Sequence, residues 1–257
     1  MSKSIKKLFS FIRRISYRLS NPTALIFLYH RVDAIKNDPH FLSVSPSNFR
    51  RQLEYIKNTY EVVPLKVLVD NLRNGKSIEK QVAITFDDGY VDNLFNALPI
   101  LEELKVPATI FITSGMVNSK KVFDWDNAIN SKDAGRALTI DELKLLSKSK
   151  YIEIGAHTVS HPKLSLLNEA QQKRELQDSK YSLEQFVGIE IKGFSYPFGA
   201  LDDFNRETKS IVKKCGFDYA CANIRERVKI NSDIFALPRF VVRDWTVSKL
   251  KLEIFKV

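Results

Sequence analysis

The stretch Ala83-Ile84-Thr85-Phe86-Asp87-Asp88-Gly89-Tyr90 is an apolar run of strand length that stops abruptly at two carboxylates and a glycine. In barrels and open α/β sheets, functional groups gather at the edge where the parallel strands end. Adjacent carboxylates repel each other, so two placed together favour a bound cation or a partner that separates their roles. Asp-Asp-Gly is also a common turn, and this stretch alone leaves a turn and a catalytic site equally open.

Similar apolar runs lie on both sides of this stretch and alternate with longer segments of helical period. The alternation predicts repeated βα units and a parallel sheet. Strands are expected at residues 24–29, 82–86, 108–113, 152–155, 193–196, 219–222 and 236–241. Helices are expected at residues 47–58, 65–74, 91–104, 140–148, 168–187 and 203–214. Seven strands suit a closed or nearly closed α/β barrel. No linker interrupts residues 24–241, so one domain is predicted over residues 21–257.

A second segment, Ile152-Glu153-Ile154-Gly155-Ala156-His157-Thr158-Val159-Ser160-His161, is a short strand that runs into a loop with two histidines. Their spacing of four residues would place both imidazoles on one face of a helical turn. Two neutral imidazoles and one carboxylate can bind zinc and leave a position open for water and substrate. Surface helices produce this spacing by chance. Together with the strand-terminal Asp87 and Asp88, however, it favours a metal site.

These two segments resemble the first two motifs of the polysaccharide deacetylases, carbohydrate esterase family four. A third, Gly193-Phe194-Ser195-Tyr196-Pro197-Phe198-Gly199, is similar to the aromatic-proline motif that lines the active-site groove of that family. The resemblance covers residues 24–241, with the motifs in the expected order. It implies a distorted (β/α) barrel of about seven parallel strands that hydrolyses the acetamide of N-acetylglucosamine-like sugars.

The resemblance also implies a role for each matching residue. Asp88, His157 and His161 would hold one divalent metal, Asp87 would act as the general base, and the backbone N–H of Phe198 would stabilise the oxyanion. A divalent ion polarises the acetyl carbonyl and lowers the pKa of water, which agrees with these roles. Zinc is the expected metal, although two histidines and one aspartate would also accept cobalt, nickel or manganese.

Four residues are expected to bind the substrate. Three belong to the third motif: Tyr196, Pro197 and Phe198. The fourth is Trp125, in the polar and irregular segment 118–137, which is predicted to be a long loop on the active face. An ordinary half-buried tryptophan is an equally open interpretation of Trp125.

The third motif departs from the family pattern, because Ser195 stands where an arginine usually orients the base. Arg239, in Leu237-Pro238-Arg239 at the end of the last predicted strand, is expected to reach the same carboxylate from another direction. A surface or purely structural arginine is the alternative.

The general acid of the family is normally a histidine at the end of a C-terminal strand, but no histidine follows His161. The first predicted strand ends in His30, within the Leu28-Tyr29-His30-Arg31-Val32 start that a subgroup of these deacetylases shows. In a closed barrel the first and last strands are neighbours, so His30 can reach the same place. We therefore predict that His30 is the acid, with a core histidine as the alternative.

The net charge of +10 would suit an anionic partner such as nucleic acid, a phosphorylated substrate or a membrane surface. No nucleic-acid-binding module is found, and no specific nucleic acid is expected. Residues 1–20 interleave Lys and Arg with apolar residues, as an interfacial helix would; peripheral contact with an anionic membrane and a solvated helix are both open. The absence of an apolar span and of a secretory signal predicts a cytoplasmic location, with a position at the inner membrane face as an option.

The first functional hypothesis is therefore a metal-dependent hydrolase that removes an N-acetyl group from an N-acetylated sugar or glycan precursor. The alternative is an inactive carbohydrate-binding protein of the same fold. The presence of Asp87, Asp88, His157 and His161 favours the enzyme.

Overall fold

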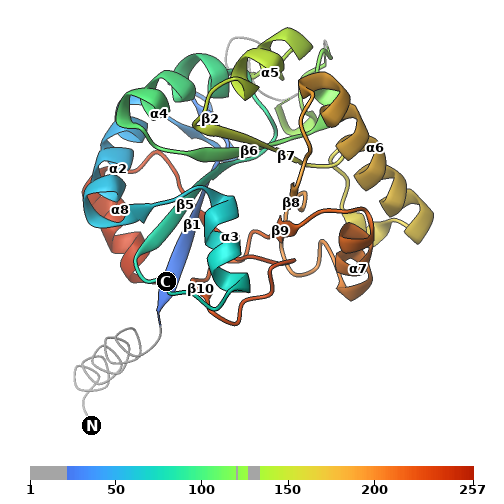
Figure 1. Cartoon of the computed structure of the whole chain (residues 1–257). Helices are drawn as coiled ribbons and strands as arrows, with labels where there is room; N and C mark the ends of the chain where they lie inside the picture. Colours follow the sequence, from blue (N-terminus) through green and yellow to red (C-terminus); the bar gives the residue numbers. More distant parts are fainter. Residues whose placement is uncertain (1–21, 120, 127–133) are drawn as a thin grey trace.

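The computed structural model describes residues 22–119, 121–126 and 134–257. Its centre is a curled, mostly parallel sheet surrounded by helices, a distorted barrel (Figure 1). Neighbouring strands pair in parallel in the order β1 (Thr23–Tyr29), β5 (Gln81–Phe86), β6 (Ala108–Ile112), β7 (Ile152–Ala156), β8 (Gly193–Ser195) and β9 (Tyr219–Cys221). The predicted α/β class and these six predicted strands are confirmed, and each strand differs from its predicted range by one residue at one end.

The ring is closed by the segment from Leu237 to Val241. Leu237 bridges to Cys221 of β9, and β11 (Phe240–Val241) pairs in parallel with β1. The single strand predicted at 236–241 is therefore wrong in length. Pro238 has no N–H for a ladder hydrogen bond and interrupts the run, so that only two residues form a regular strand.

Four further strands are too short to leave an alternating sequence pattern. β2 (Arg31–Val32) pairs in parallel with β3 (Ser43–Val44), and β4 (Glu61–Val62) pairs in parallel with β5. β10 (Val228–Lys229) is the antiparallel exception and lies beside the start of β1. None of the four was predicted.

Most of the helices cover the outside of the ring, and α3 (Leu65–Arg73) packs against the residues inside it (Figure 1). The others are α2 (Pro46–Thr59), α4 (Leu98–Leu104), α5 (Ile140–Ser147), α6 (Glu169–Val187), α7 (Arg206–Lys214) and α8 (Val247–Phe255). A π-helical turn, η1 (Asn93–Ala97), precedes α4, so the helix predicted at 91–104 is not regular throughout. Helix α8 was not predicted, although Thr246 caps its first turn. The helix predicted at 203–214 begins at Arg206, because the Asn205 side chain caps it in a capping box.

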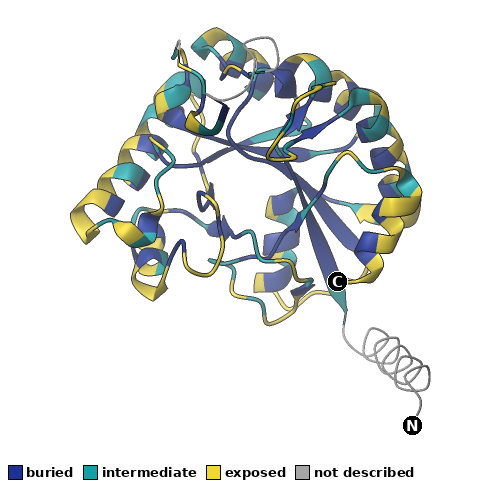
Figure 2. Ribbon diagram, turned by 180° about the vertical axis from the view of Figure 1, so that it is seen from behind, coloured by how far each residue is buried: buried dark blue, intermediate teal, exposed yellow. Residues whose placement is uncertain are grey.

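Burial follows the two faces of the sheet. Figure 2 shows the sheet and the inner helix faces buried and the outer helix faces exposed. Leu25 and Phe27 of β1 point outward into the main core, whereas Ala24 and Ile26 point into the ring, where Leu68 of α3 belongs to the same cluster. Both sides of β1 are thus packed, and the ends of β1, β5, β7 and β8 are left to form a site.

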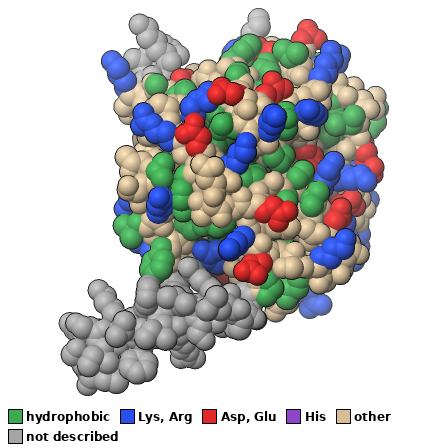
Figure 3. All heavy atoms as spheres, turned by 60° about the vertical axis from the view of Figure 1, so that its left-hand side comes forward, with side chains coloured by type: hydrophobic (Ala, Val, Ile, Leu, Met, Phe, Trp, Pro, Cys, Tyr) green, Lys and Arg blue, Asp and Glu red, His purple; other side chains and the backbone are tan. Residues whose placement is uncertain are grey.

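Charges of both signs are mixed on one face of the molecule (Figure 3). On the face shown in Figure 3, Lys and Arg side chains are interspersed with Asp and Glu side chains and do not form one basic patch. No helix in the described ranges is long and apolar enough to cross a bilayer. The amphipathic segment predicted at residues 1–20, with its expected membrane contact, lies outside the described residues.

Candidate active site and metal centre

The ends of four parallel strands meet at one face of the ring. Asp87 and Asp88 follow β5, His157 follows β7, Ser195 ends β8 and His30 follows β1. A cavity of about 420 Å³ opens there. Its lining includes five of the predicted side chains, His30, Asp87, Asp88, His157 and His161.

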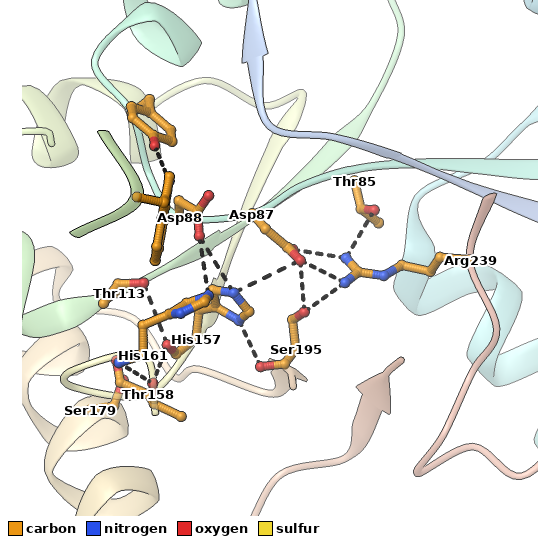
Figure 4. A network of polar contacts seen from close by, with 12 residues as sticks. Thr85, Asp87, Asp88, Thr113, His157, Thr158, His161, Ser179, Ser195 and Arg239 are labelled. Carbon is orange, nitrogen blue, oxygen red and sulfur yellow. Dashed lines mark hydrogen bonds and ion pairs between the residues drawn. The ribbon is translucent and has the colours of Figure 1, made fainter. Parts of the chain in front are cut away.

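Asp88, His157 and His161 form the candidate metal centre. One possible ligand atom from each lies within 4.8 Å of the others. The Oδ1 atom of Asp88 is 3.6 Å from the Nε2 atoms of both histidines (Figure 4). Two donors held about 2.0–2.1 Å from a tetrahedral zinc ion lie roughly 3.4 Å apart, so the two distances from Asp88 to the histidines are close to those that such an ion requires.

Electrostatics also favour a cation at this place. Burial, together with the charges of Asp87 and Asp126, raises the pKa of Asp88 well above its ordinary value. Burial lowers the pKa of His157, and burial and the neighbouring His157 lower the pKa of His161 to about 2. Both imidazoles are therefore neutral at pH 7, the form that binds a metal.

His157 is oriented by a hydrogen bond. Its Nδ1 atom lies 2.7 Å from the backbone oxygen of Ser195, which accepts the Nδ1–H and leaves Nε2 to face Asp88. Metal-binding histidines are commonly fixed in this way by a partner behind the ring.

His161 has different surroundings. Its Nδ1 atom is buried and has no hydrogen-bond partner among the described residues. Its ring lies between two aromatic rings, with centroids 4.6 Å from Trp125 and 4.8 Å from Phe198. Packing takes the place of a hydrogen bond on this side.

The loop that carries His161 is fastened to α6. The carboxylate of Glu175 accepts hydrogen bonds from the backbone of Val159 at 2.8 Å and of Ser160 at 3.0 Å. The hydroxyl of Ser179 donates to the carbonyl of Thr158 at 3.0 Å. No sequence spacing links Glu175 to the histidines, and it was not predicted.

The site also concentrates strained backbone. Asp88, Thr158, His161 and Phe198 have φ angles of 75°, 64°, 59° and 60°. Positive φ is uncommon for residues other than glycine, and it persists only where the surroundings over-determine it. Three of the four, Asp88, His161 and Phe198, line the cavity, which supports the prediction of a functional site there.

Asp87 is held by Arg239 in a buried pair. Arg239 donates from Nη1 to Oδ1 at 2.8 Å and from Nη2 to Oδ2 at 2.6 Å. The Ser195 hydroxyl donates to Asp87 Oδ2 at 3.1 Å and accepts from Arg239 Nη2 at 2.8 Å. Burial acts to raise the pKa of Asp87, but the charge and the hydrogen bonds of Arg239 outweigh it and hold the pKa well below its usual range. Asp87 is therefore ionised and is able to accept a proton.

Arg239 is itself positioned by the barrel wall. Its Nε donates to the carbonyl of Ala222 at 3.1 Å, and its side chain is fully buried. The structure thus places Arg239 against the predicted base.

His30 lies in the same cavity as Asp87 and His157. Burial lowers its pKa to about 4, against an opposing effect of the Asp87 charge. Its backbone carbonyl accepts a hydrogen bond from Asn93 Nδ2 at 2.8 Å. Closure of the ring by β11 beside β1 brings this N-terminal residue to the site.

The four predicted substrate-binding residues divide into two pairs. Phe198, which is 48% exposed, and Trp125 line the cavity. Tyr196 and Pro197 do not line the cavity, so the prediction that they lie there is wrong. Side chains alternate along a strand, so where Ser195 faces the site Tyr196 faces away. Tyr196 stacks on Phe204 at 4.0 Å between ring centroids and donates to the carbonyl of Phe235 at 2.9 Å.

A buried polar chain behind Trp125 was also not predicted. Trp125 Nε1 donates to the hydroxyl of Tyr90 at 2.8 Å, and this hydroxyl donates to Asp126 at 2.8 Å. The position of Tyr90 directly after Asp-Asp-Gly was the only available signal.

The chain is similar to known deacetylases in sequence and in structure. A family model for polysaccharide deacetylases matches residues 74–220. The poly-beta-1,6-N-acetyl-D-glucosamine N-deacetylase of Staphylococcus aureus is 28% identical over 253 residues, covering 90% of this chain and 82% of that protein. The deacetylase PplD of Streptococcus pyogenes, solved in complex with acetate, has a TM-score of 0.75 at 21% identity and covers 91% of this chain and 98% of that chain. IcaB from Ammonifex degensii has a TM-score of 0.73 at 21% identity over 91% and 97% of the two chains.

Proposed function

The chain belongs to the polysaccharide deacetylase family, and we propose that it is a metal-dependent hydrolase that removes N-acetyl groups from a polymer of N-acetylglucosamine. The single observation that carries the proposal is the donor set of Asp88, His157 and His161 directly beside the buried, ionised Asp87. The Staphylococcus aureus relative, named for a β-1,6-linked polymer, supports that linkage as the first to test.

The metal would be held by Asp88, His157 and His161. When bound, a divalent ion supplies Lewis acidity to the acetyl carbonyl and lowers the pKa of water, and zinc is our first choice. The buried, neutral imidazoles and the raised pKa of Asp88 support this assignment, because a cation would stabilise the ionised carboxylate.

Asp87 would act as the general base. Arg239 keeps it ionised and fixes its orientation through two hydrogen bonds, so it can accept a proton from the attacking water. A carboxylate with a depressed pKa is a weak base. Its contribution therefore depends on position and on the acidity that the metal gives to the water.

His30 would act as the general acid. Its low pKa makes it neutral before the reaction and a strong acid once it is protonated. One water and one acetamide give acetate and an amine, so the proton that Asp87 takes from the water must end on the amine nitrogen. Neutral His30 would accept that proton before it acts as the acid. His30 would deliver a proton to the nitrogen as the carbon–nitrogen bond breaks.

The backbone N–H of Phe198 would stabilise the oxyanion. It donates to no acceptor within the described residues, and the positive φ of Phe198 holds it in a turn at the cavity. A preorganised N–H of this kind contributes where negative charge develops on the carbonyl oxygen. Phe198 and Trp125 would contact the sugar.

Acetate release tests the proposal. Purified protein is given β-1,6-linked N-acetylglucosamine oligomers, free N-acetylglucosamine, UDP-N-acetylglucosamine and a lipid-linked N-acetylated glycan, first with zinc and then with a chelator. We expect acetate from the oligomers, its loss on chelation and its return when zinc is restored. Acetate release that is unaffected by chelation, or none from any substrate with zinc, would overturn the proposal.

A further inference from the structure

Three side chains of one short segment hold the backbone that follows β1, and we call them the clamp. They are Asp92, which immediately precedes the π-helical turn η1, and Asn93 and Asn96 within that turn. Asn93 Nδ2 donates to the carbonyl of His30 at 2.8 Å. Asn96 Nδ2 donates to the carbonyl of Val32 at 2.8 Å, and the Asp92 carboxylate accepts the N–H of Val32 at 3.0 Å. Three successive peptide units after His30 are therefore each held by one side chain of the clamp.

His30 lies where the sheet no longer holds the chain. The pairing of β1 with β5 ends at Tyr29, and β2 begins only at Arg31. The His30 carbonyl is thus beyond the last paired residue of β1. Backbone polar groups inside a protein need a partner, and Asn93 supplies the one that the sheet does not. The direction in which the chain leaves β1 is set by the clamp.

The His30 ring has no hydrogen bond of its own. It lines the active-site cavity, but no described side chain or backbone group donates to it or accepts from it. Asp87, by contrast, is held by two hydrogen bonds from Arg239. The place of the His30 ring therefore depends on packing and on the backbone that the clamp holds.

Stability alone does not explain an asparagine at position 93. The Asn93 side chain is fully buried, and its Oδ1 has no hydrogen-bond partner in the described part of the chain. An unpaired buried acceptor is costly, and an apolar residue of similar size would avoid that cost. What the amide contributes is its donor Nδ2, which lies 2.8 Å from the His30 carbonyl and 3.3 Å from Asp92 Oδ1. Its place in a π-helical turn points the same way, because such turns are rare and occur frequently at functional sites.

Arg31 braces the clamp from the other side. Its Nε donates to Asp92 Oδ2 at 2.9 Å, and both side chains are only 5% exposed. The Arg31 guanidinium carbon lies 4.8 Å from the centroid of the Tyr90 ring. Hydrogen bonds between charged groups are stronger than neutral ones. Asp92 therefore fixes the side chain of Arg31 and the backbone of Val32 together.

We propose that Asn93, supported by Asp92 and Asn96, is a positioning residue for His30. None of the three lines the active-site cavity, yet protonation of the departing amine depends on them. The inference rests on the proposed function, in which His30 is the general acid. Proton transfer requires heavy atoms within about 2.6–3.2 Å of each other, and a misplacement of about 1 Å can cost on the order of 10²-fold in rate.

A double-mutant cycle tests the inference. Acetate release from β-1,6-linked N-acetylglucosamine oligomers is measured for zinc-loaded protein with Asn93→Ala, with His30→Ala and with both changes. Asn93→Ala should lower kcat by about 10²-fold and leave KM nearly unchanged. In protein that already lacks His30 the same change should cost nothing further, because Asn93 acts through that ring. Losses that multiply, or a normal kcat for Asn93→Ala, would overturn the inference.

A substrate that needs no acid gives a second measurement. The leaving group of para-nitrophenyl acetate is stable as an anion, so its hydrolysis should be nearly insensitive to Asn93→Ala and His30→Ala. Asp87→Asn should still lower it, because the base is needed for both substrates. Equal losses on the ester and the amide in Asn93→Ala would mean that the change disturbs the whole site, against the inference.

Matched variants separate positioning from folding. Gln172→Ala removes another buried amide, which donates to the carbonyl of Leu167 at 2.9 Å, has an unpaired Oε1 among the described residues and does not line the cavity. It should lower Tm about as much as Asn93→Ala and leave kcat unchanged. Asn96→Ala removes only the bond to the Val32 carbonyl and replaces Asn93→Ala if that variant does not fold. Its smaller loss of kcat should also vanish in the His30→Ala protein, and a loss that persists there would contradict the inference.

The imidazole signals of His30 distinguish this inference from the proposed function. In ¹⁵N spectra of the zinc-loaded protein, Asn93→Ala should shift or broaden them, and Gln172→Ala should not. If the unchanged protein released no acetate while these signals responded to Asn93→Ala alone, the proposed function would fall and the hold of the clamp on His30 would stand. Acetate release together with unmoved His30 signals would sink the inference alone.

Discussion

The two histidines of the candidate metal centre are four residues apart, yet the protein holds them by different means. His157 lies at the end of a strand, and its Nδ1–H is accepted by the Ser195 carbonyl at 2.7 Å. His161 lies in a loop, without a partner for Nδ1 in the described part of the chain, and packs between Trp125 and Phe198. One wall of the site is polar and built on strands, and the other is aromatic and built on loops.

This difference predicts different roles for the two walls. A hydrogen bond behind a metal ligand fixes its tautomer and ring orientation. The polar wall also carries Asp87 and Arg239, so it sets the protonation of the base. Aromatic rings restrict His161 by shape and exclude water, and Trp125 and Phe198 also face the cavity that a sugar would enter. Changes to the polar wall should therefore cost chemistry and stability. Changes to the aromatic wall should cost less, mainly in metal retention.

The largest effect is expected for Asp87→Asn on the polar wall. The amide keeps the shape but accepts no proton, so kcat should fall by about 10²–10⁴-fold, the usual contribution of a general base. Zinc content, measured by elemental analysis, should stay near one ion per chain. The control is Asp178→Asn on the exposed side of α6. Near-normal acetate release by the Asp87 variant would mean that this wall does not supply the base.

Arg239→Met should have the next largest effect, on the free energy of unfolding. It leaves the Asp87 carboxylate buried without its cation, and breaking a buried ion pair typically costs about 3–5 kcal/mol. Urea unfolding at pH 7 measures it, with the exposed Arg174→Met as control. A loss as small as that of the control would show that the pair is not a structural part of the polar wall.

The pH dependence of the same pair gives a signed test. In the natural protein the pKa of Asp87 lies below its ordinary 3.8, so its ionised form adds stability above that value, which is lost as the pH falls through the lower, folded pKa. In Arg239→Met the cation beside Asp87 is gone and burial dominates, so the pKa of Asp87 in the folded protein should rise above its ordinary value. That variant loses stability as the pH rises. The difference between the two proteins should therefore widen from pH 4 to pH 7, and a constant difference would contradict the assignment.

Replacing each histidine by alanine compares the walls directly. Either change removes a metal ligand. Mutating a group that only supports a ligand typically lowers metal affinity by roughly 10–100-fold, so losing the ligand itself should lower zinc affinity by more. In metal-free protein, His157→Ala should lower the free energy of unfolding by about 1–3 kcal/mol, because the buried Ser195 carbonyl loses its donor. His161→Ala loses no such bond and should cost less. The exposed His40→Ala is the control, and equal costs for the two ligands would remove the distinction.

The polar wall was far more predictable from sequence than the aromatic one. β5 ends at Asp87 and Asp88, and β7 ends just before His157, so strand ends carry these residues and leave a strong pattern. Barrel closure placed His30 beside them, because neighbouring strands follow from topology. Arg239 also lies on a strand-like segment, which is why its reach to Asp87 could be anticipated.

The aromatic wall depends on contacts between loops, and these contacts leave no helical or strand periodicity in the sequence. The chain from Trp125 through Tyr90 to Asp126 joins segments 35 and 36 residues apart. Glu175 holds the His161 loop from another helix, again without a sequence signal. The mistaken place of Tyr196 is of a different kind. Once Ser195 is assigned to the site, strand alternation turns Tyr196 away, and this rule was available from the sequence.

The smallest predicted effect is on Trp125, and it decides whether the aromatic wall serves the metal or only the sugar. The Trp125 ring is fixed by its hydrogen bond to Tyr90 and lies 4.6 Å from the His161 ring, so removing it takes away one of the two aromatic rings that pack against an imidazole whose Nδ1 has no hydrogen-bond partner in the described residues. Trp125→Ala should therefore weaken zinc binding by about 10-fold, at the low end of the effects of groups behind a ligand. Trp125→Phe keeps a ring beside His161 and should restore most of it. Competition with a chromophoric chelator measures both, and Trp245→Ala, the change at the chain's other tryptophan, is the matched control that should leave zinc affinity unchanged. If Trp125→Ala raised KM for the oligomer but bound zinc normally, the aromatic wall would be a sugar contact alone, and His161 would have to be held in place by its loop and Glu175.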